Sequence, residues 1–417
     1  MNKYALFIAI ALMAGTVGVQ AQGNSPDLGD KPYVIRFKEG ALPQVKPGSV
    51  RDDRAAQDPE GWAYLSEQVL SHVQSIERRY GVRADAAFGS VFKGMAVRLK
   101  PAQLEQLQRD PSVERIEAEQ VYGIGARPTK GGTTTTVPQI VPWGITKTQA
   151  SQSYTLAGNG TGAVAGVRAY VIDTGIDTAN ADLNRIGLVN FVGDRKNTDC
   201  NGHGTHVAGT MAAYDNTIDV VGMAPGVMTY GVKVLDCNGS GTTTSVIKGI
   251  DWVAANAIKP AVANMSLGGG VSQLLDDAVR AAAAKGIVFS IAAGNSAANA
   301  CTSSPARVGG GTTPGVLVVA AIDSSDAEAS FSNYGSCVDI WAPGVSIPSL
   351  KIGGGLATMS STSMAAPHVG GAAALLYGRY PTTAYDSVTT TLRQMAVTPG
   401  TLSKDGRAIT RLNANIQ

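Results

Sequence analysis

Residues 360–369 read SSTSMAAPHV, and an apolar, alanine-rich segment continues from there through Leu376. A run of small polar residues that gives way to such a segment predicts a loop leading into the N-terminus of a buried helix. Ser363 lies at this junction, where its backbone N–H is at the positive end of the helix dipole and can stabilise charge on a reacting oxygen. Most serines at such junctions are helix N-caps. Ser363 is therefore a candidate nucleophile only if other segments supply its partners.

The chain around this stretch alternates continuously apolar segments with alanine-rich helical ones. The expected strands are residues 169–172, 228–234, 261–265, 287–292 and 316–321, and the clearest expected helices are 245–257 and 274–284. Apolar strands separated by helices indicate an α/β fold with a parallel sheet covered on both faces. In such sheets, ligands gather at the carboxyl ends of the strands. We therefore expect the polar residues that follow these strands to lie at one edge.

Three polar residues follow strands or open a helix at that edge. Asp173 comes directly after the first expected strand, where an acid can orient a histidine, although a turn-forming Asp is the commoner explanation. His203 lies in the segment NGHGTHVAG (201–209), and an imidazole titrates near neutral pH, as a general base must. Asn295 ends the segment IAAGN (291–295), where its amide can donate to an oxyanion or cap the next segment.

Two other kinds of site are disfavoured by the same segments. His203 and His206 could bind a metal, but they are three residues apart with no intervening Glu, so the zinc-protease motif is absent. The Gly-x-Ser-x-Gly pattern of α/β-hydrolases is missing around Ser363. The segment NMSLGGG (264–270) also ends a strand, and its glycines leave an edge for another chain, although a plain glycine-rich turn has the same pattern.

The N-terminal part of the chain has a different composition. Residues 22–130 hold 31 charged residues, whereas the much longer stretch 131–417 holds 34. The first stretch shows a β-α-β-β-α-β pattern, with a helix expected over 60–80 and a last strand over 113–121. This order suits a small ferredoxin-like α+β domain. The join at 127–137, rich in Thr, Gly and Pro, is typical of a linker. We expect a first domain at 22–126, a linker or variable segment at 127–141, and a second domain at 142–417.

The first 21 residues have the features of a signal peptide. Lys3 precedes an apolar run, and VQA (19–21) resembles a small-residue cleavage site. Export to an oxidising compartment makes two disulfides the expected state of the four cysteines, with three possible pairings. A zinc site is disfavoured because no Cys-x-x-Cys pair exists. The net charge of +2 gives no indication of a nucleic-acid or membrane partner.

The order of Asp173, His203, Asn295 and Ser363 is similar to that in the subtilisin family of serine proteases, in the branch that includes proteinase K and aqualysin. The matching segments are VIDTGI (171–176), NGHGTHVAGT (201–210), NMSLGG (264–269), AAGN (292–295) and TSMAAPHV (362–369). Five motifs in the correct order make the resemblance specific, and it covers roughly Pro142 to the C-terminus. The first domain resembles the inhibitory propeptide of the same enzymes. The resemblance implies a subtilisin-like three-layer fold with a mostly parallel sheet.

The resemblance also implies how the site works. Ser363 would attack a peptide carbonyl, His203 would carry the proton, and Asp173 would hold the imidazole. The amide of Asn295 and the N–H of Ser363 would form an oxyanion hole, and His206 would be structural. Substrate would bind as an extended strand, with a broad preference for apolar or aromatic residues. The implied substrate-binding residues are Gly239, Ser240 and Gly241 on one side and Ser266, Leu267 and Gly268 on the other.

Several further features follow only from the resemblance. It implies disulfides Cys200–Cys237 and Cys301–Cys337, and a structural calcium bound by Asp339 with the carbonyls of Pro314 and Val316. It implies a monomer without a catalytic cofactor, whose partners are protein substrates and its own propeptide. With the signal-like start, the protein is expected to be secreted to the medium or the periplasm. Self-cleavage is expected near Ala126–Arg127, and the extended linker leaves later sites open.

Two departures from the family pattern bear on these expectations. Ser361 stands where the family usually has Gly, and it would add strain if that position needs a positive φ. The segment 309–313 looks longer than its equivalent in the family, close to the implied calcium ligands. The departure at Ser361 keeps open an alternative, a catalytically inactive binding protein on the same fold.

Overall fold

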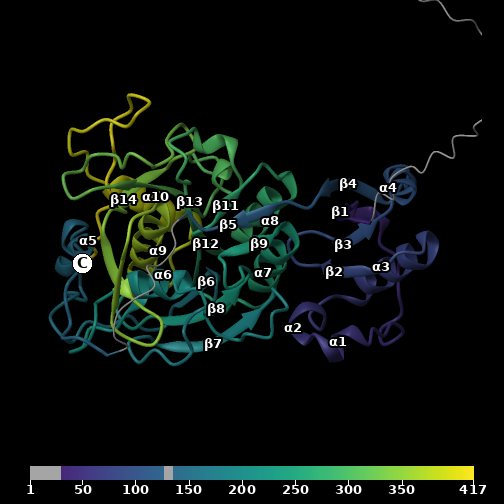
Figure 1. Cartoon of the computed structure of the whole chain (residues 1–417), viewed down its shortest axis with the longest axis horizontal. Helices are drawn as coiled ribbons and strands as arrows, with labels where there is room; N and C mark the ends of the chain where they lie inside the picture. Colours follow the sequence, from purple (N-terminus) through teal and green to yellow (C-terminus); the bar gives the residue numbers. More distant parts are fainter. Residues whose placement is uncertain (1–29, 126–134) are drawn as a thin grey trace, which may run out of the picture.

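The computed structural model describes residues 30–125 and 135–417 as two packed domains, each built around its own sheet (Figure 1). The expected signal peptide at 1–21 and the expected cleavage bond Ala126–Arg127 lie outside the described residues. Within the described ranges, no helix combines the length and the apolar character needed to span a membrane.

The first domain is a four-stranded antiparallel sheet with helices on one face. Its strands are β1 (Lys31–Phe37), β2 (Ala84–Phe88), β3 (Gly94–Leu99) and β4 (Val113–Ala118), in the order β2-β3-β1-β4. Helices α3 (Glu67–Tyr80) and α4 (Pro101–Gln108) connect β1 to β2 and β3 to β4. Their apolar faces and the sheet enclose one core. The predicted β-α-β-β-α-β order is confirmed.

Two predicted elements of this domain are interrupted. The helical pattern expected over 60–80 is broken because the Ser66 hydroxyl accepts the N–H of Val69 and begins α3 as a separate helix. The strand expected over 113–121 ends at Ala118. The next strand, β5 (Val121–Gly123), is not part of this sheet and pairs with strands of the second domain.

The second domain is built on a seven-stranded sheet in which every neighbouring pair is parallel. In spatial order the strands are β14 (Ile340–Pro343), β13 (Val316–Ile322), β12 (Ile287–Ala292), β10 (Ala261–Met265), β6 (Arg168–Asp173), β8 (Met228–Lys233) and β7 (Arg185–Asn190). The five predicted strands lie within one residue of their predicted bounds. The two edge strands were not predicted, because β7 begins with two exposed residues and has a glycine in its middle, and β14 is short and ends in Pro343.

Helices cover both faces of this sheet, which gives three layers (Figure 1). Helices α6 (His203–Ala212), α9 (Thr362–Arg379) and α10 (Tyr385–Met395) pack on one face, and α7 (Thr243–Asn256) and α8 (Gln273–Ala284) on the other. Every residue of α6 is buried, and so is α9 from 362 to 377. Small side chains let these two helices approach each other and the sheet closely, which explains their Ala- and Gly-rich sequences.

The remaining elements are short and lie between the main strands and helices. They are helices α1 (Arg54–Gln57), α2 (Pro59–Trp62) and α5 (Trp143–Lys147), strands β5 (Val121–Gly123), β9 (Ser240–Thr242), β11 (Gly268–Gly269), β15 (Ile347–Leu350) and β16 (Leu356–Met359), and 3-10 turns at Glu39–Ala41, Ala150–Gln152, Ala300–Thr302 and Ala306–Val308.

The outer face of the first sheet packs against helices α7 and α8. Val34, Phe88 and Phe92 belong to the same apolar cluster as residues of these two helices. Acidic side chains of the first domain also lie at both helix N-termini. Glu119 Oε1 accepts the N–H of Thr244 (3.1 Å), and Glu117 Oε2 accepts the hydroxyl of Ser272 (2.7 Å). Negative charge at a helix N-terminus is stabilising, so these contacts favour the docked arrangement.

Asp251, a buried acid in the middle of α7, receives four hydrogen bonds from the first domain. Its Oδ1 accepts the N–H groups of Ser90 (2.7 Å) and Val91 (2.6 Å). Its Oδ2 accepts the N–H of Gly89 (3.0 Å) and the hydroxyl of Tyr64 (2.8 Å). Hydrogen bonds to an ionised acceptor are roughly twice as strong as neutral ones. The carboxylate therefore holds the β2–β3 connection of the first domain on α7.

We expect Asp251→Asn to loosen this interface, because an amide cannot accept all four bonds and turns its own N–H₂ toward other donors. The measurement is hydrogen exchange of the amides of residues 89–91 in a chain kept intact by Ser363→Ala. Exchange there should be at least about tenfold faster, since hydrogen bonds to charged groups contribute about 1.5–3 kcal/mol each.

The matched control is Asp277→Asn, which removes the half-buried pair between Asp277 and Arg36 (2.9 Å) at the edge of the same interface. The other partners of Asp277, Gln273 and Arg280, lie within α8 itself. Equal exchange at residues 89–91 in both variants, or no change in either, would contradict the role assigned to Asp251.

Candidate active site

Three of the predicted residues lie at the carboxyl edge of the parallel sheet. Asp173 is the last residue of β6, His203 the first of α6, and Ser363 the second of α9. The carboxyl ends of parallel strands share one edge, so helices that begin there direct their N-termini to the same region. Each of the three residues is at most 1% exposed.

The carboxylate of Asp173 holds His203 through one ring nitrogen. Its Oδ1 and Oδ2 lie 2.8 and 3.0 Å from Nδ1 of His203, and Oδ1 also accepts the N–H of Thr174 (2.7 Å). A carboxylate at Nδ1 places the ring proton there, so Nε2 carries the lone pair. Nε2 is buried and has no hydrogen-bond partner in the part of the chain that the structure describes. It is therefore available as a base.

Asp199 positions the start of helix α6, and the sequence analysis missed it. Its carboxylate accepts the N–H groups of Asn201, Gly202 and Thr205 and the hydroxyls of Thr174 and Thr205, at 2.6–2.9 Å. These contacts join the loop after β6 to the helix that carries His203. The available sequence signal was an acid four residues before the helix, where negative charge favours a helix start.

The hydroxyl of Ser363 is not hydrogen-bonded to His203 in this structure. It donates to the carbonyl of Ser266 (3.2 Å), and the Ser266 hydroxyl donates to the carbonyl of Ser363 (2.8 Å). Asn264 fixes Ser266, because its Nδ2 donates to the Ser266 hydroxyl (2.9 Å). Catalytic hydrogen bonds are often formed only when substrate is bound. A rotation about the Cα–Cβ bond of Ser363 is enough to change the acceptor.

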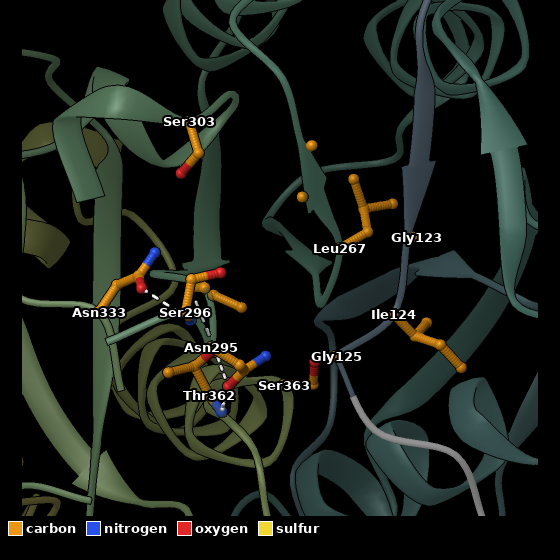
Figure 2. Close-up of a pocket in the computed structure, with 14 residues that line it drawn as sticks. Gly123, Ile124, Gly125, Leu267, Asn295, Ser296, Ser303, Asn333, Thr362 and Ser363 are labelled. Atoms are coloured by element: carbon orange, nitrogen blue, oxygen red, sulfur yellow. Dashed lines mark hydrogen bonds between the residues drawn. The ribbon is translucent and has the colours of Figure 1, made fainter. Parts of the chain in front are cut away.

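Asn295 presents its amide nitrogen as a donor because its oxygen is already engaged. Oδ1 accepts the backbone N–H (2.8 Å) and the hydroxyl (3.0 Å) of Thr362, which leaves Nδ2 free to donate. A Cβ on Gly125 would overlap Nδ2, so the chain's own Gly125 lies against this donor. Figure 2 shows Gly125 beside Ser363 and Asn295 beside Thr362.

The turn that carries Asn295 is held by Asn333, which the sequence analysis also missed. Oδ1 of Asn333 accepts the N–H of Ser296 (2.9 Å) (Figure 2). It also accepts the N–H of Ala298 (3.0 Å), and Nδ2 donates to the carbonyl of Ala293 (2.9 Å). One side chain thus fixes the backbone on both sides of Asn295. No motif surrounds Asn333, so only the fold reveals this role.

The strain expected at Ser361 is absent. Its φ of −177° and ψ of 160° are extended backbone that any residue adopts, so the family's glycine is not needed for a positive φ. Ser361 is the N-cap of α9, and its hydroxyl accepts the N–H of Ser363 (3.0 Å). The serine therefore changes the site in an unexpected way, by occupying the backbone donor that the resemblance assigns to an oxyanion hole.

Strand β5 lies in the groove predicted to bind substrate. It pairs antiparallel with β9 on one side and with β11 on the other. The N–H of Ile124, just after β5, donates to the carbonyl of Gly239 (3.2 Å). The predicted binding segments 239–241 and 266–268 thus flank a strand of the same chain, in the manner by which extended peptides add to sheet edges.

A cavity of about 420 Å³ adjoins β5 and Ser363 (Figure 2). Its lining includes two larger apolar residues, Ile124 and Leu267, and the small residues Gly268, Gly269, Ala292, Gly294, Ser296 and Ser303. No charged side chain is found among the described residues that line it. Gly125 has no side chain that could fill the cavity, so the cavity stays open beside β5.

Two disulfides are present, and their pairing, Cys200–Cys237 and Cys301–Cys337, is the one that the resemblance implies. The first joins the loop before α6 to the loop between β8 and β9, and so ties the helix of His203 to one wall of the groove. The two bonds span 37 and 36 residues. In the chain-entropy model, loops of this size are each worth about 3–4 kcal/mol.

The set of residues expected to bind calcium, Pro314, Val316 and Asp339, does not fit that ion. Arg393 pairs with Asp339 (3.0 Å) and donates to the carbonyl of Val316 (2.8 Å), so a positive charge already lies at these oxygens. In the described ranges, the one cluster with metal-ligand spacing is Asp194, Cys200 and Cys237, and its two cysteines are joined in a disulfide.

Two further histidines are buried in the second domain. Nε2 of His206 donates to the carbonyls of Ile347 (3.0 Å) and Ala357 (3.1 Å), which holds the β15–β16 hairpin on α6. Burial, followed by the nearby charge of His203, lowers the pKa of His206 to about 3. Burial likewise lowers the pKa of His368 to about 4. Both side chains are therefore neutral near pH 7.

Both domains are similar to known proteins. The Subtilase family pattern matches residues 165–411, and the Peptidase inhibitor I9 pattern matches residues 32–124. An "Extracellular serine proteinase" of Thermus sp. (strain Rt41A) is 40% identical over 389 residues, which cover 90% of this chain and 87% of that protein. "Alkaline serine exoprotease A" of Vibrio alginolyticus is 43% identical over 313 residues, which are 72% of this chain but 55% of that relative's length.

A solved structure of a cold adapted subtilisin-like serine proteinase is also similar to this chain. It is 42% identical, with a TM-score of 0.57, and the match covers 66% of this chain and 98% of that structure.

We expect His206→Gln to reduce the loss of stability in acid. The folded-state pKa near 3 lies below the unfolded value of about 6.5, so the unfolded chain binds more protons between these pH values. Stability that depends on neutral His206 is complete above about pH 6.5 and is lost as the pH falls toward 3, by up to about 1.4 kcal/mol per pH unit. Glutamine does not titrate, so the variant should lose less.

The measurement is the guanidinium unfolding midpoint of both proteins between about pH 8 and pH 4, with Ser363→Ala present to prevent degradation. The difference near pH 8, where both side chains are neutral, gives the effect of packing alone. Curves that stay parallel down to pH 4 would contradict the pKa of His206.

Proposed function

The chain belongs to the subtilase family, and we propose that it is an exported serine endopeptidase made as a self-inhibited, self-processing precursor. The enzyme class follows from the family and from the serine proteinases to which the chain is similar. The observation that carries the proposal is β5, which lies in the substrate groove and brings Gly125 against Asn295, beside Ser363 (Figure 2).

In the proposed reaction, Ser363 Oγ attacks the carbonyl carbon of a peptide while its proton passes to Nε2 of His203. The tetrahedral intermediate collapses with cleavage of the C–N bond, and His203 returns the proton to the leaving amine. Water then attacks the acyl-enzyme, loses a proton to His203, and releases Ser363 as its hydroxyl. Asp173, 2.8 Å from Nδ1, stabilises the imidazolium in both halves.

Substrate binding would prepare Ser363 for this attack. Its hydroxyl donates to the carbonyl of Ser266, in the segment that forms one wall of the groove. β5 pairs with Gly268 and Gly269 of this wall and leaves the Ser266 carbonyl to Ser363. A substrate that also pairs with the Ser266 carbonyl would compete for that acceptor. The freed hydroxyl can then rotate toward Nε2 of His203, which has no partner among the described residues.

The negative oxygen of the intermediate would be held by Nδ2 of Asn295 and the N–H of Ser363. In a protease of this family, loss of one side-chain donor of this kind lowers turnover about 10²–10³-fold. In this chain the N–H of Ser363 already donates to the Ser361 hydroxyl (3.0 Å), which the oxyanion must displace. The exchange costs part of one neutral hydrogen bond, about 0.5–1.5 kcal/mol.

The first domain would act as an intramolecular inhibitor. It matches the Peptidase inhibitor I9 pattern. Its strand β5 pairs with both walls of the groove. Asp251 and the N-termini of α7 and α8 hold the domain in place. Cleavage near Ala126–Arg127 remains our proposal, because Gly125, the residue before that segment, lies beside Ser363. After cleavage the domain would stay bound until it is itself degraded.

The proposed specificity is broad, with a preference for apolar or aromatic residues. Backbone pairing in the groove does not depend on side-chain identity, and the adjoining cavity is uncharged and open at about 420 Å³. We further propose secretion to the medium or periplasm, in agreement with the signal-like start and the two disulfides, and action as a monomer that needs no catalytic cofactor.

The direct test is casein hydrolysis and conversion of the precursor by the purified protein and by Ser363→Ala. We expect the variant to lose both activities by at least about 10³-fold, since the nucleophile is absent. The matched control is Ser360→Ala in the same stretch, whose exposed hydroxyl accepts the N–H of Ser346. Activity in Ser363→Ala equal to that of the control would contradict the proposal.

The alternative of an inactive binding protein draws on two observations: the Ser363 hydroxyl does not contact His203, and its N–H is occupied by Ser361. A fluorophosphonate probe separates the two functions, because it labels only a serine activated by its base. Labelling of Ser363 in processed protein supports the protease, and its absence there supports the binding protein.

We expect Ser361→Gly and Ser361→Ala to raise turnover of a chromogenic peptide amide by about two- to tenfold, because both free the Ser363 N–H for the oxyanion. The substitution to Gly costs only a few tenths of a kcal/mol of helix capping. The effect should fall on kcat and leave KM nearly unchanged, since the bond to the oxyanion exists only in the transition state. A large loss of kcat in both variants would show that the site depends on this hydroxyl.

A further inference from the structure

The strands β13 and β14 and the helix α10 meet at one corner of the second domain, around the carboxylate of Asp339. We propose that the guanidinium of Arg393 is a built-in cation at this corner, in the position that the resemblance assigns to a calcium ion. The corner is then held together without metal. This inference does not depend on the catalytic activity.

The carboxylate of Asp339 is buried, with 1% of its side chain exposed, and both oxygens are engaged. Oδ1 accepts the N–H of Gly311 (2.7 Å) and two N–H groups of Arg393, at 3.0 Å for Nη2 and 3.2 Å for Nε. Oδ2 accepts the N–H of Val318 (2.8 Å). A buried carboxylate requires such partners, and here nitrogen donors supply all of those that the structure shows.

Arg393 lies in the last turn of α10 and reaches a second ligand of the implied ion. Its Nη2 donates to the carbonyl of Val316 (2.8 Å), the first residue of β13. One nitrogen therefore bridges Asp339 Oδ1 and the Val316 carbonyl, the two oxygens between which calcium would lie. Calcium needs six to eight oxygens at 2.3–2.6 Å, and here it would meet a fixed positive charge.

The glycine-rich segment 309–313 explains how this corner differs from the family pattern. Gly310 and Gly311 have φ of 72° and 71°, and a Cβ on Gly309 or Gly310 would overlap the backbone of residues 336–337. The glycines thus let the loop fold tightly against that segment and direct the N–H of Gly311 at Asp339. A calcium site needs oxygen acceptors around the ion, whereas this loop contributes a donor to the carboxylate.

The test compares local hydrogen exchange in EDTA and in calcium, in the full chain with Ser363→Ala. The amides of Gly311 and Val318 donate to Asp339 and report on this corner alone. We expect their exchange rates to be the same in both conditions, because Arg393 supplies the charge. Slowing by about tenfold or more in calcium would show that the ion binds there and would overturn the proposal.

A second experiment removes the guanidinium of Arg393. In EDTA, Arg393→Ser should speed exchange of the Gly311 and Val318 amides by at least about tenfold, because it leaves a buried carboxylate unpaired. Added calcium should restore most of the protection, since the oxygens are then free for a metal. Exchange like that of the parent in EDTA, or no recovery in calcium, would overturn the assignment of Arg393 to the ion's place.

The matched control is Arg307→Ser, which unpairs the buried Asp276 (3.1 Å) elsewhere in the same domain. Arg307 and Arg393 are similarly exposed, at 31% and 27%, and each partner acid is at most 1% exposed. In this control, calcium should not restore protection from hydrogen exchange around Asp276. An equal recovery there would show a general effect of the ion and would overturn the proposal. If Arg393→Ser does not fold, Arg393→Lys tests the same point, because it keeps the charge and should show no response to calcium.

Discussion

The contact between Asp173 and His203 is the constraint on which the rest of the second domain depends. At 2.8 Å it joins the end of a buried strand to the first residue of a buried helix, so both elements must be fixed from several sides. Asp199 ties the loop after β6 to the start of α6, and the Cys200–Cys237 bond ties that start to the groove wall. Gly204 allows the approach, since a Cβ there would overlap the carbonyl of Gly175. The polar contact is thus held by a largely apolar, close-packed layer, in which a shift of one ångström would be costly.

The same backbone groups that are proposed to bind substrate already bind the chain's own β5. This arrangement would link docking to inhibition, because β5 pairs with both walls of the groove while its domain packs on α7 and α8. The contacts at Asp251, Thr244 and Ser272 use charge at or near helices, whereas β5 uses backbone pairing that any peptide can reproduce. In the proposed function, inhibition would therefore come from the tethered domain, and the groove itself would remain unselective.

The sequence was sufficient to predict the buried elements, because burial requires mostly apolar residues and these are visible as apolar segments. The five inner strands are continuous apolar runs, and Asp173, His203 and Ser363 follow strands or open helices as predicted. It did not reveal side chains whose role exists only in three dimensions, such as Asn333, which fixes the turn of Asn295 without any local motif. The pairing of Arg393 with Asp339 at the implied calcium ligands was also beyond the sequence: the two residues are 54 positions apart along the chain, and only the fold brings them together. At Ser361 the residue type was noticed, but its effect is a hydrogen bond and not strain.

The central claim is that this chain cleaves itself in the site that β5 already occupies. The most direct measurement is the first-order rate constant for conversion of the precursor, followed by intact mass over a roughly hundredfold range of protein concentration. An intramolecular reaction has a rate constant that does not change with dilution, and this is the result we expect. A rate that falls in proportion to concentration would show that one molecule processes another, and would contradict self-cleavage in the site that β5 occupies.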